Sequence, residues 1–549
     1  MKIVTITVTD EFGNVTNDPQ KSTYQLDLET EGFDSIEKAV INFKNQMLPD
    51  LQKQLLEEEQ EEFIQKKTDN LRCNGTAPIT IKTLNGSFPF KNQRFLENNC
   101  DHTSHTYLGL TSQFEDGHTS EGLKEFSAYY ANRLSYEEVE ELVERTTGEK
   151  QLSDQSVQNT VVTKALEVSN QVASEASSVL EDDTLSLPEI NQEVDVYDAE
   201  TKEALIFVDG IGVKKQSESR VSSKSTSVKI EDDTENANNR VNTNVVLLEK
   251  KAGYFEHITS VIDQKGEELL PLSDIVKSKV IQEYGNDAEA VNFVAITDGA
   301  KNIRTMLIAL FGDRLVIILD WYHHCPKVRE LMSMIAKNKS EKIEHLEFLL
   351  NHLWHGRTEE VLNYLRTKIK AKNEGKLQEL ITYIEKHHEE IIDYDRRKKA
   401  GKEVGLEPEQ AEDEFVQNQQ SSNTKTVDTD GVSVPCDSII GKHQKPKEAN
   451  LNQELEGVKA KNKSSSKAKV TKKVVGSGRV EKACDSIIGK RQKRKAMSFR
   501  PVGSRSLAIL KVVELNHKWL DIWFPPIASN DLQRAANDPC ESNELELVA

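Results

Sequence analysis

Short apolar runs alternate with longer segments of helical periodicity in the middle of the chain. Two of these runs, 204–208 and 293–297, are each followed at once by an Asp-Gly pair, which predicts an acid at the tip of a buried strand. Taken together, the pattern predicts strands at 204–208, 245–248, 254–258, 293–297 and 315–319, and helices at 272–284, 301–310 and from 322 to about 394. Strands first, then strand–helix alternation, then helices indicate an α/β fold with a mixed sheet flanked by helices.

The N-terminal region, residues 1–115, has a different pattern that predicts an α+β arrangement. Two short strands are expected within 1–30, a long charged helix at 36–67 and short strands around 79–81. The mostly helical region that follows, 116–170, contains a helix-turn-helix candidate.

The helix-turn-helix candidate is marked by helix start and stop signals. Ser135 and Glu138 form a capping box, Gly148 is a stop signal, and Ser153 caps a second helix. Two short amphipathic helices joined by a glycine-containing turn fit a DNA-reading unit, although many helical hairpins with this pattern bind nothing.

The remaining segments are assigned from composition and from an internal repeat. Residues 171–203 are expected to be an acidic linker, 204–402 the first part of a catalytic core, 403–473 a polar insertion without ordered structure, 474–530 the second part of the core, and 531–549 a tail. The heptapeptide Cys-Asp-Ser-Ile-Ile-Gly-Lys begins at both Cys436 and Cys484, so we interpret the first copy as a partial duplication that arrived with the insertion.

Charge is distributed unevenly along the 549 residues, which are enough for two to four domains. The net charge of −20 argues against nucleic acid, but 461–505 carries fifteen Lys or Arg against two acids. A solvated basic linker is the alternative explanation for its first part. The residues expected to contact DNA are Arg479, Lys482, Lys490, Arg491, Lys493, Arg494 and Lys495.

Composition also indicates the cellular compartment in which the protein works. Six cysteines without paired spacing indicate reduced thiols, and Cys100-x-His-x-x-His has poor spacing for a zinc site. The sequence contains no apolar run long enough to span a membrane, so a cytoplasmic protein without membrane partners is expected.

Three carboxylates are candidates for a metal site. Asp209 and Asp298 follow the two apolar runs, and Glu481 lies in the basic segment. Carboxylates held a few ångströms apart can bind two Mg²⁺ or Mn²⁺ ions for phosphodiester cleavage. A strand-end Asp-Gly is also often only a turn. The repeat selects Glu481, because the position corresponding to it in the first copy is Ser433.

Several motifs in a fixed order make the chain similar to a known family. Val208-Asp-Gly210, Thr297-Asp-Gly-Ala300, Leu319-Asp-Trp-Tyr-His323, Leu353-Trp-His-Gly356, Tyr394-Asp-Arg-Arg397 and Gly476-Ser-Gly-Arg-Val-Glu481 resemble the DDE transposases of bacterial insertion sequences. The resemblance is greatest to the ISKra type, with Mutator-like enzymes as more distant relatives. It covers about 120–170 and 200–530.

The resemblance implies a fold and an activity. It implies a ribonuclease H-like core in which Asp209, Asp298 and Glu481 bind two Mg²⁺ (or Mn²⁺) ions. The implied reaction cuts DNA at the ends of the element and transfers the 3′-hydroxyl into target DNA. Asp320 and His323 match an Asp-x-x-His element, whose histidine is thought to help position DNA or the active site. Double-stranded DNA (terminal inverted repeats and target), a homo-oligomer and a location at the nucleoid follow as expectations.

Departures from the family leave other functions open. About 70 residues separate the Tyr394 region from the Gly-Ser-Gly motif, where family members have almost none. A degenerate or co-opted transposase that only binds DNA is therefore the alternative. A metal-dependent phosphatase is a third possibility, but it would have no use for the basic segment.

Overall fold

The computed structural model divides into two compact units, which we describe separately. The first comprises Met1–Val194, Lys202–Ile317 and Arg479–Ala549, and the second comprises Asp195–Thr201 and Ile318–Gly478. The residues described are 2–9, 12–13, 15, 22–26, 32–98, 103–111, 118–188, 195–201, 203–216, 239–285, 291–312, 315–402, 478–494 and 497–525. The predicted insertion at 403–473, with the first heptapeptide, and the tail at 531–549 lie outside them.

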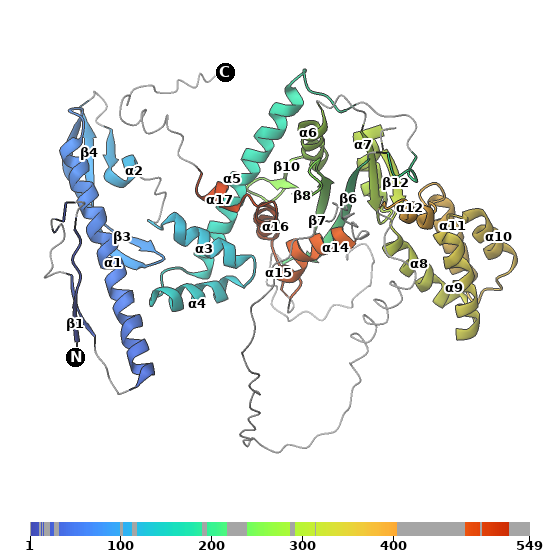
Figure 1. Cartoon of the computed structure of the whole chain (residues 1–549), viewed down its shortest axis with the longest axis horizontal. Helices are drawn as coiled ribbons and strands as arrows, with labels where there is room; N and C mark the ends of the chain where they lie inside the picture. The colour runs from blue at the N-terminus through green and yellow to red at the C-terminus, as the bar shows by residue number, and fades with distance from the viewer. Residues whose placement is uncertain are drawn as a thin grey trace, which may run out of the picture. The chain divides into compact units, whose positions relative to one another are not determined.

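The first unit begins with strands and one long helix. Strands β1 (Lys2–Thr5) and β2 (Thr23–Leu26) pair antiparallel, as do β3 (Leu71–Thr83), β4 (Gly86–Glu97) and β5 (Ser104–Thr106) in a second sheet. Helix α1 (Phe33–Lys66) packs along β4, and α2 (Tyr107–Thr111) follows β5 (Figure 1). The short strands predicted near 79–81 are therefore the middle of a long hairpin.

Three helices follow, with the predicted start and stop signals in place. They are α3 (Glu121–Ala131), α4 (Tyr136–Thr147) and α5 (Asp154–Glu181). The Ser135–Glu138 capping box forms, Gly148 ends α4 with φ 84°, and Ser153 caps α5.

Helix α5 is longer than predicted and corrects the acidic linker expected at 171–203. Its last eleven residues, 171–181, continue the helix. Val172 and Ala173 pack against the core of the central sheet, and Ala176 is buried. These small apolar residues recur at helical spacing among the acids, so burial of one face holds the helix together beyond the predicted end.

A five-stranded mixed sheet forms the centre of the first unit, in the order β12-β11-β6-β7-β8. Its strands are β6 (Glu203–Lys214), β7 (Arg240–Glu249), β8 (Phe255–Thr259), β11 (Asn292–Thr297) and β12 (Leu315–Leu319). β7 pairs antiparallel with both β6 and β8, whereas β11 runs parallel to β6. The α/β class with a mixed sheet and flanking helices is confirmed.

Helices cover the sheet and bury its apolar runs. α6 (Leu272–Tyr284) and α7 (Lys301–Phe311) share one core with β6, β7, β8 and β11 (Figure 1). A hairpin of β9 (Val261–Ile262) and β10 (Glu268–Leu270) leads into α6.

The C-terminal segment adds a second helical core to this unit. It contains α14 (Gly478–Cys484), the π-helical turn η3 (Asp485–Gly489), α15 (Lys490–Gln492), α16 (Pro501–Leu515) and α17 (Trp519–Trp523). α16 packs along α5, and a shared apolar cluster joins α3, α4 and α5 to α16 and α17 (Figure 1).

The second unit is helical. It contains α8 (Trp321–Ile335), α9 (Lys339–Trp354), α10 (Thr358–Thr367), α11 (Glu374–Lys386) and α12 (Tyr394–Lys399). Trp321, Trp354 and Tyr394 form an aromatic cluster with ring centroids 5.1–5.7 Å apart. The Tyr394 hydroxyl donates a 2.7 Å hydrogen bond to the Leu319 carbonyl. Aromatic residues of three of the sequence motifs are thus explained by packing.

Within the described part of the chain, none of the helices has the length and apolarity needed to cross a membrane.

The turn at Gly356 gives a test of this packing. Gly356 has φ 67°, and a Cβ added there would meet the backbone of Ile392 and Asp393 at 2.9 Å. We expect Gly356→Ala to lower the free energy of unfolding by about 1–3 kcal/mol, through backbone strain and this clash. Urea unfolding followed by tryptophan fluorescence measures it.

Gly375→Ala is the matched control, because Gly375 is helical and its added Cβ has only an ordinary contact, 3.4 Å from the Asn373 side chain. Its stability is expected to stay level or rise slightly. Equal losses in both variants would contradict the packing of the Gly356 turn.

Candidate functional site

Asp209 lies in the middle of a strand, not at its tip. β6 continues to Lys214, and Asp209 pairs in register with Val245 of β7. The strand extends because Ile211 and Val213 alternate with polar or small residues and are buried. The prediction of a strand end was therefore wrong. The Asp209 side chain is half-buried, so part of it remains exposed on the sheet.

Asp298 occupies the predicted position directly after β11. The last registered pair of the parallel strands β11 and β6 is Thr297 with Val208, so Asp298 follows beside Asp209. Neighbouring strands lie about 4.8 Å apart, which places the two aspartates on adjacent strands at the same level. The Asp298 carboxylate accepts a 2.8 Å hydrogen bond from the Ala300 amide, as a turn aspartate does.

Glu481 is carried by α14, and this helix docks against β6. The Cys484 thiol, one helical turn after Glu481, donates a hydrogen bond to the Asp209 carboxylate. Burial raises the pKa of Cys484 well above its usual range, and the negative charges of Asp209 and Glu481 raise it further. Since residues three apart share a helix face, Glu481 lies on the face of α14 that is turned toward Asp209.

The three carboxylates are not gathered around a single point. Among the described residues, neither Asp209 nor Asp298 belongs to a group of three possible ligands whose atoms all lie within 4.8 Å of one another. The second unit does contain a group that meets this limit, formed by His355, Asp393 and Asp395. Acidic groups able to hold a metal are thus present, but Asp395 also pairs with Lys399 at 2.5 Å.

Asp320 and His323 lie in the second unit, at the start of α8. The buried Asp320 carboxylate caps the helix, accepting hydrogen bonds from the His323 amide at 3.1 Å and from its Nδ1 at 2.9 Å. His324 is fully buried, and burial lowers its pKa to about 3, so it stays neutral. Of the two histidines, only His323 is partly exposed.

Apart from Arg491, the residues predicted to contact DNA divide into three groups. Lys490, Lys493 and Arg494 are exposed, and Arg479 and Lys482 line a cavity that is described below. Lys495 lies outside the described residues.

Arg491 is placed differently from the other predicted DNA contacts. It is 4% exposed, donates a 2.7 Å hydrogen bond to the Ala131 carbonyl and lies over the Tyr136 and Phe499 rings. This burial corrects its assignment: the guanidinium joins α15 to the end of α3 and is not presented to DNA.

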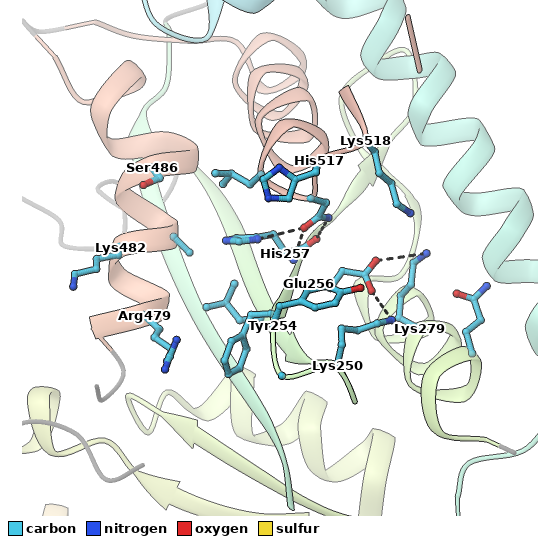
Figure 2. A pocket seen from close by; sticks show the side chains of 17 residues that line it. Lys250, Tyr254, Glu256, His257, Lys279, Arg479, Lys482, Ser486, His517 and Lys518 are labelled. Carbon is cyan, nitrogen blue, oxygen red and sulfur yellow. Dashed lines mark hydrogen bonds and ion pairs between the residues drawn. The ribbon is translucent and has the colours of Figure 1, made fainter. Parts of the chain in front are cut away.

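A cavity of about 690 Å³ lies on the other side of α14 (Figure 2). We call it the basic cavity, because five of its seventeen lining side chains are Lys or Arg and only one is acidic. They are Lys250, Lys279, Arg479, Lys482 and Lys518, with Glu256 as the single acid. The excess of positive charge contrasts with the net charge of −20 of the whole chain.

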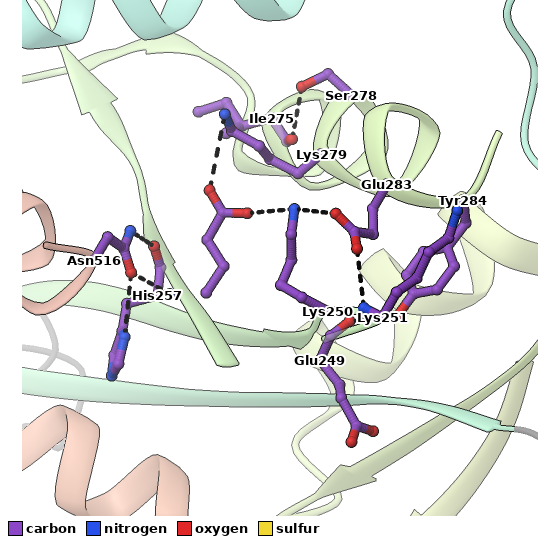
Figure 3. Close-up of polar contacts among 11 residues, drawn as sticks. Glu249, Lys250, Lys251, His257, Ile275, Ser278, Lys279, Glu283, Tyr284 and Asn516 are labelled. Carbon is purple, nitrogen blue, oxygen red and sulfur yellow. Dashed lines mark hydrogen bonds and ion pairs between the residues drawn. The ribbon is translucent and has the colours of Figure 1, made fainter. Parts of the chain in front are cut away.

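The acid in the basic cavity is neutralised by its neighbours. Glu256 pairs with Lys250 at 3.0 Å and with Lys279 at 3.8 Å (Figure 2). Lys250 also meets Glu283 at 2.8 Å (Figure 3). Burial alone lowers the pKa of Lys250, but hydrogen bonds and charge from Glu283 and Glu256 outweigh it and raise the pKa. Lys250 therefore remains charged.

The rim of the basic cavity is fixed by an asparagine clamp. Asn516 accepts a 2.8 Å hydrogen bond from the His257 amide and donates one of 2.8 Å to the His257 carbonyl (Figure 3). Burial lowers the pKa of the His257 ring, which favours its neutral form. This clamp holds the loop of His517 and Lys518 against β8.

Sequence reasoning missed Cys484, Tyr254 and Lys518 as site residues. Cys484 could have been found from its spacing of three after Glu481, which places both on one helix face. No local signal marks Tyr254 or Lys518, because the cavity joins segments far apart in the chain.

Comparison with known proteins adds no relative. No protein-family model matches the chain, and no curated protein sequence matches it.

Burial of Arg491 leads to a stability prediction. We expect Arg491→Ala to lower the free energy of unfolding by about 2–3 kcal/mol, since a hydrogen bond from a charged group and two ring contacts are lost. Arg494→Ala, an exposed neighbour, is expected to change it by less than about 0.5 kcal/mol. Urea unfolding of both variants decides; an undiminished stability of Arg491→Ala would contradict the structural role.

Proposed function

We propose that the chain is a DDE transposase, which cuts DNA at the ends of its element and joins the freed 3′-hydroxyl to target DNA. The observation that carries this proposal is the docking of α14 on β6. It turns Glu481 toward Asp209, while Asp298 follows the neighbouring strand in register. These are the three carboxylates that the resemblance to DDE transposases assigns to catalysis.

The sheet supports the same proposal. Its order, with three antiparallel strands β6-β7-β8 and two further strands on the other side of β6, is the order expected of a ribonuclease H-like core. In chain order, Asp209 lies on the first strand of this sheet, and Asp298 follows its fourth strand.

The donor set fits hard divalent cations. Mg²⁺ and Mn²⁺ prefer carboxylate oxygens, and all three side chains offer only these. In two-metal sites the ions lie about 3.5–4 Å apart, so ligands of different ions need not share a 4.8 Å sphere. Bound ions would activate the attacking oxygen and stabilise the leaving oxygen.

The chain's own residues orient the reaction. Asp209 is held by the Cys484 thiol and Asp298 by the Ala300 amide, so both carboxylates are fixed by the protein. In the cutting step, water attacks the phosphorus and the P–O bond breaks, leaving a 3′-hydroxyl. In the joining step, that hydroxyl attacks a target phosphorus, and the displaced 3′-oxygen of the target takes up a proton.

DNA contacts are assigned to two surfaces. The exposed cations Lys490, Lys493 and Arg494 would grip backbone phosphates, and α4 with α5 would read the terminal repeats. His323 would help to position the DNA. Action on paired ends requires a homo-oligomer and places the protein at the nucleoid.

A DNA-binding protein without strand transfer is the second candidate. It is favoured by the spread of the three carboxylates beyond a single 4.8 Å group. Such a protein would bind the repeats without cleaving them.

Cleavage of the element's end DNA tests both candidates. We expect the wild type to nick a labelled duplex carrying the inverted repeat next to this gene, only with Mg²⁺ or Mn²⁺. Asp298→Ala should lower the rate at least a hundredfold, because one ligand is lost. Denaturing gels measure the product.

Asp521→Ala is the control, an exposed aspartate on α17. Equal cleavage by Asp298→Ala and wild type would refute the transposase. Binding of the repeats by the wild type without any cleavage would support the second candidate.

A further inference from the structure

The two sides of α14 carry different chemistry. Glu481 and Cys484 share the side that meets Asp209. Arg479, Lys482 and Ala483 of α14, with Ser486 of the following turn η3, line the basic cavity instead (Figure 2). One helix thus separates the proposed catalytic carboxylates from a set of cations.

The basic cavity combines fixed positive charge with aromatic surface. Tyr254 lies in its wall with 59% of its surface exposed, so its ring is open to a ligand. Beside it, the Arg479 guanidinium lies 4.9 Å from the centre of the Phe255 ring. Cations that track a backbone and aromatic faces that stack bases are the two elements of single-strand binding sites.

The size of the basic cavity limits what it can hold. Its volume of about 690 Å³ falls in the range of sites for molecules the size of a nucleotide. A DNA duplex is too wide to enter it. A base that is unpaired and turned out of the helix can enter, with its phosphate facing Lys482 and Lys518.

We propose that the basic cavity binds one unpaired nucleotide of the DNA strand that is being processed. This inference rests on the proposed function for the identity of the strand. An α-helix with its side chains is about 10–12 Å across. The bound nucleotide therefore lies within a few nucleotides of the phosphate that Asp209 would face.

The test compares two DNA substrates in binding assays. One is a fluorescein-labelled end duplex, fully paired; the other has three unpaired nucleotides beside the cleavage position. Fluorescence anisotropy with the full-length wild type in EDTA measures binding without cleavage. We expect the unpaired substrate to bind at least tenfold more tightly, and equal affinities would overturn the proposal.

Tyr254→Ala tests the stacking surface. Stacking of one base on an aromatic side chain corresponds to at least a fivefold change in affinity. We expect this loss for the unpaired substrate and none for the paired duplex. Phe524→Ala, which removes another exposed aromatic that does not line the cavity, should change neither. An equal effect of both variants would overturn the proposal.

Lys518→Gln tests the phosphate contact. Binding of the unpaired substrate should weaken, and its dependence on salt should fall by about one charge. Lys265→Gln, an exposed lysine outside the cavity, is the control and should leave both unchanged. Tighter binding of free deoxyadenosine monophosphate than of the unpaired DNA would overturn the proposal in favour of a free nucleotide.

The outcomes separate this inference from the proposed function. A wild type that prefers unpaired DNA but never cleaves supports the basic cavity and counts against the transposase. A wild type that cleaves but does not distinguish the substrates counts against the cavity alone.

Discussion

The docking of the C-terminal segment on β6 is the contact on which the rest of the first unit depends. Two contacts reach β6 and its end: the Cys484 thiol meets Asp209, and the Phe499 backbone bonds with Lys214 and Gln216. A third contact, from Arg491 to the Ala131 carbonyl, ties the same segment to α3. Together with the packing of η3 against α16, these contacts fix α14 relative to the sheet. They thereby set the positions of Glu481 and of the two cavity cations on this segment, Arg479 and Lys482.

Two of these contacts use a buried polar group, Cys484 and Arg491, and each of these groups has a hydrogen-bond partner. Arg491 shows why this matters: a buried guanidinium without a hydrogen bond would be strongly destabilising, whereas a paired one fixes a geometry. The same holds for Lys250, between Glu256 and Glu283. The basic cavity thus collects positive charge within an acidic chain, and the two carboxylates beside Lys250, Glu256 and Glu283, are both paired.

The sequence predicted the local elements well and the long-range contacts poorly. α6 begins and ends at the predicted residues, and the Ser135 capping box forms, because both depend on neighbours within a few positions. Asp209 was misplaced because glycines hid the alternation of Ile211 and Val213. The paired strand β7, which stabilises that extension, comes from a distant segment.

In the candidate site, too, local features could be predicted from the sequence and long-range contacts could not. Asp298 could be placed from the apolar run before it, since one strand determines its position. The structural role of Arg491 could not be recognised, because in sequence it is one cation among many in a basic segment. Tyr254 has no local signal at all. Its significance comes only from α14 and Lys518, which belong to another part of the chain.

The carboxylates owe their orientation to the chain itself. Asp209 accepts hydrogen bonds from the Cys484 thiol and from the Gly210 amide at 2.7 Å, and Asp298 accepts one from Ala300. Because the raised pKa of Cys484 keeps its thiol protonated, this hydrogen bond persists at neutral pH. Carboxylates fixed in this way lose little freedom when a cation binds, which is the physical meaning of a preorganised site. The same thiol lies one turn from Glu481, so it links the strand acid to the helix acid.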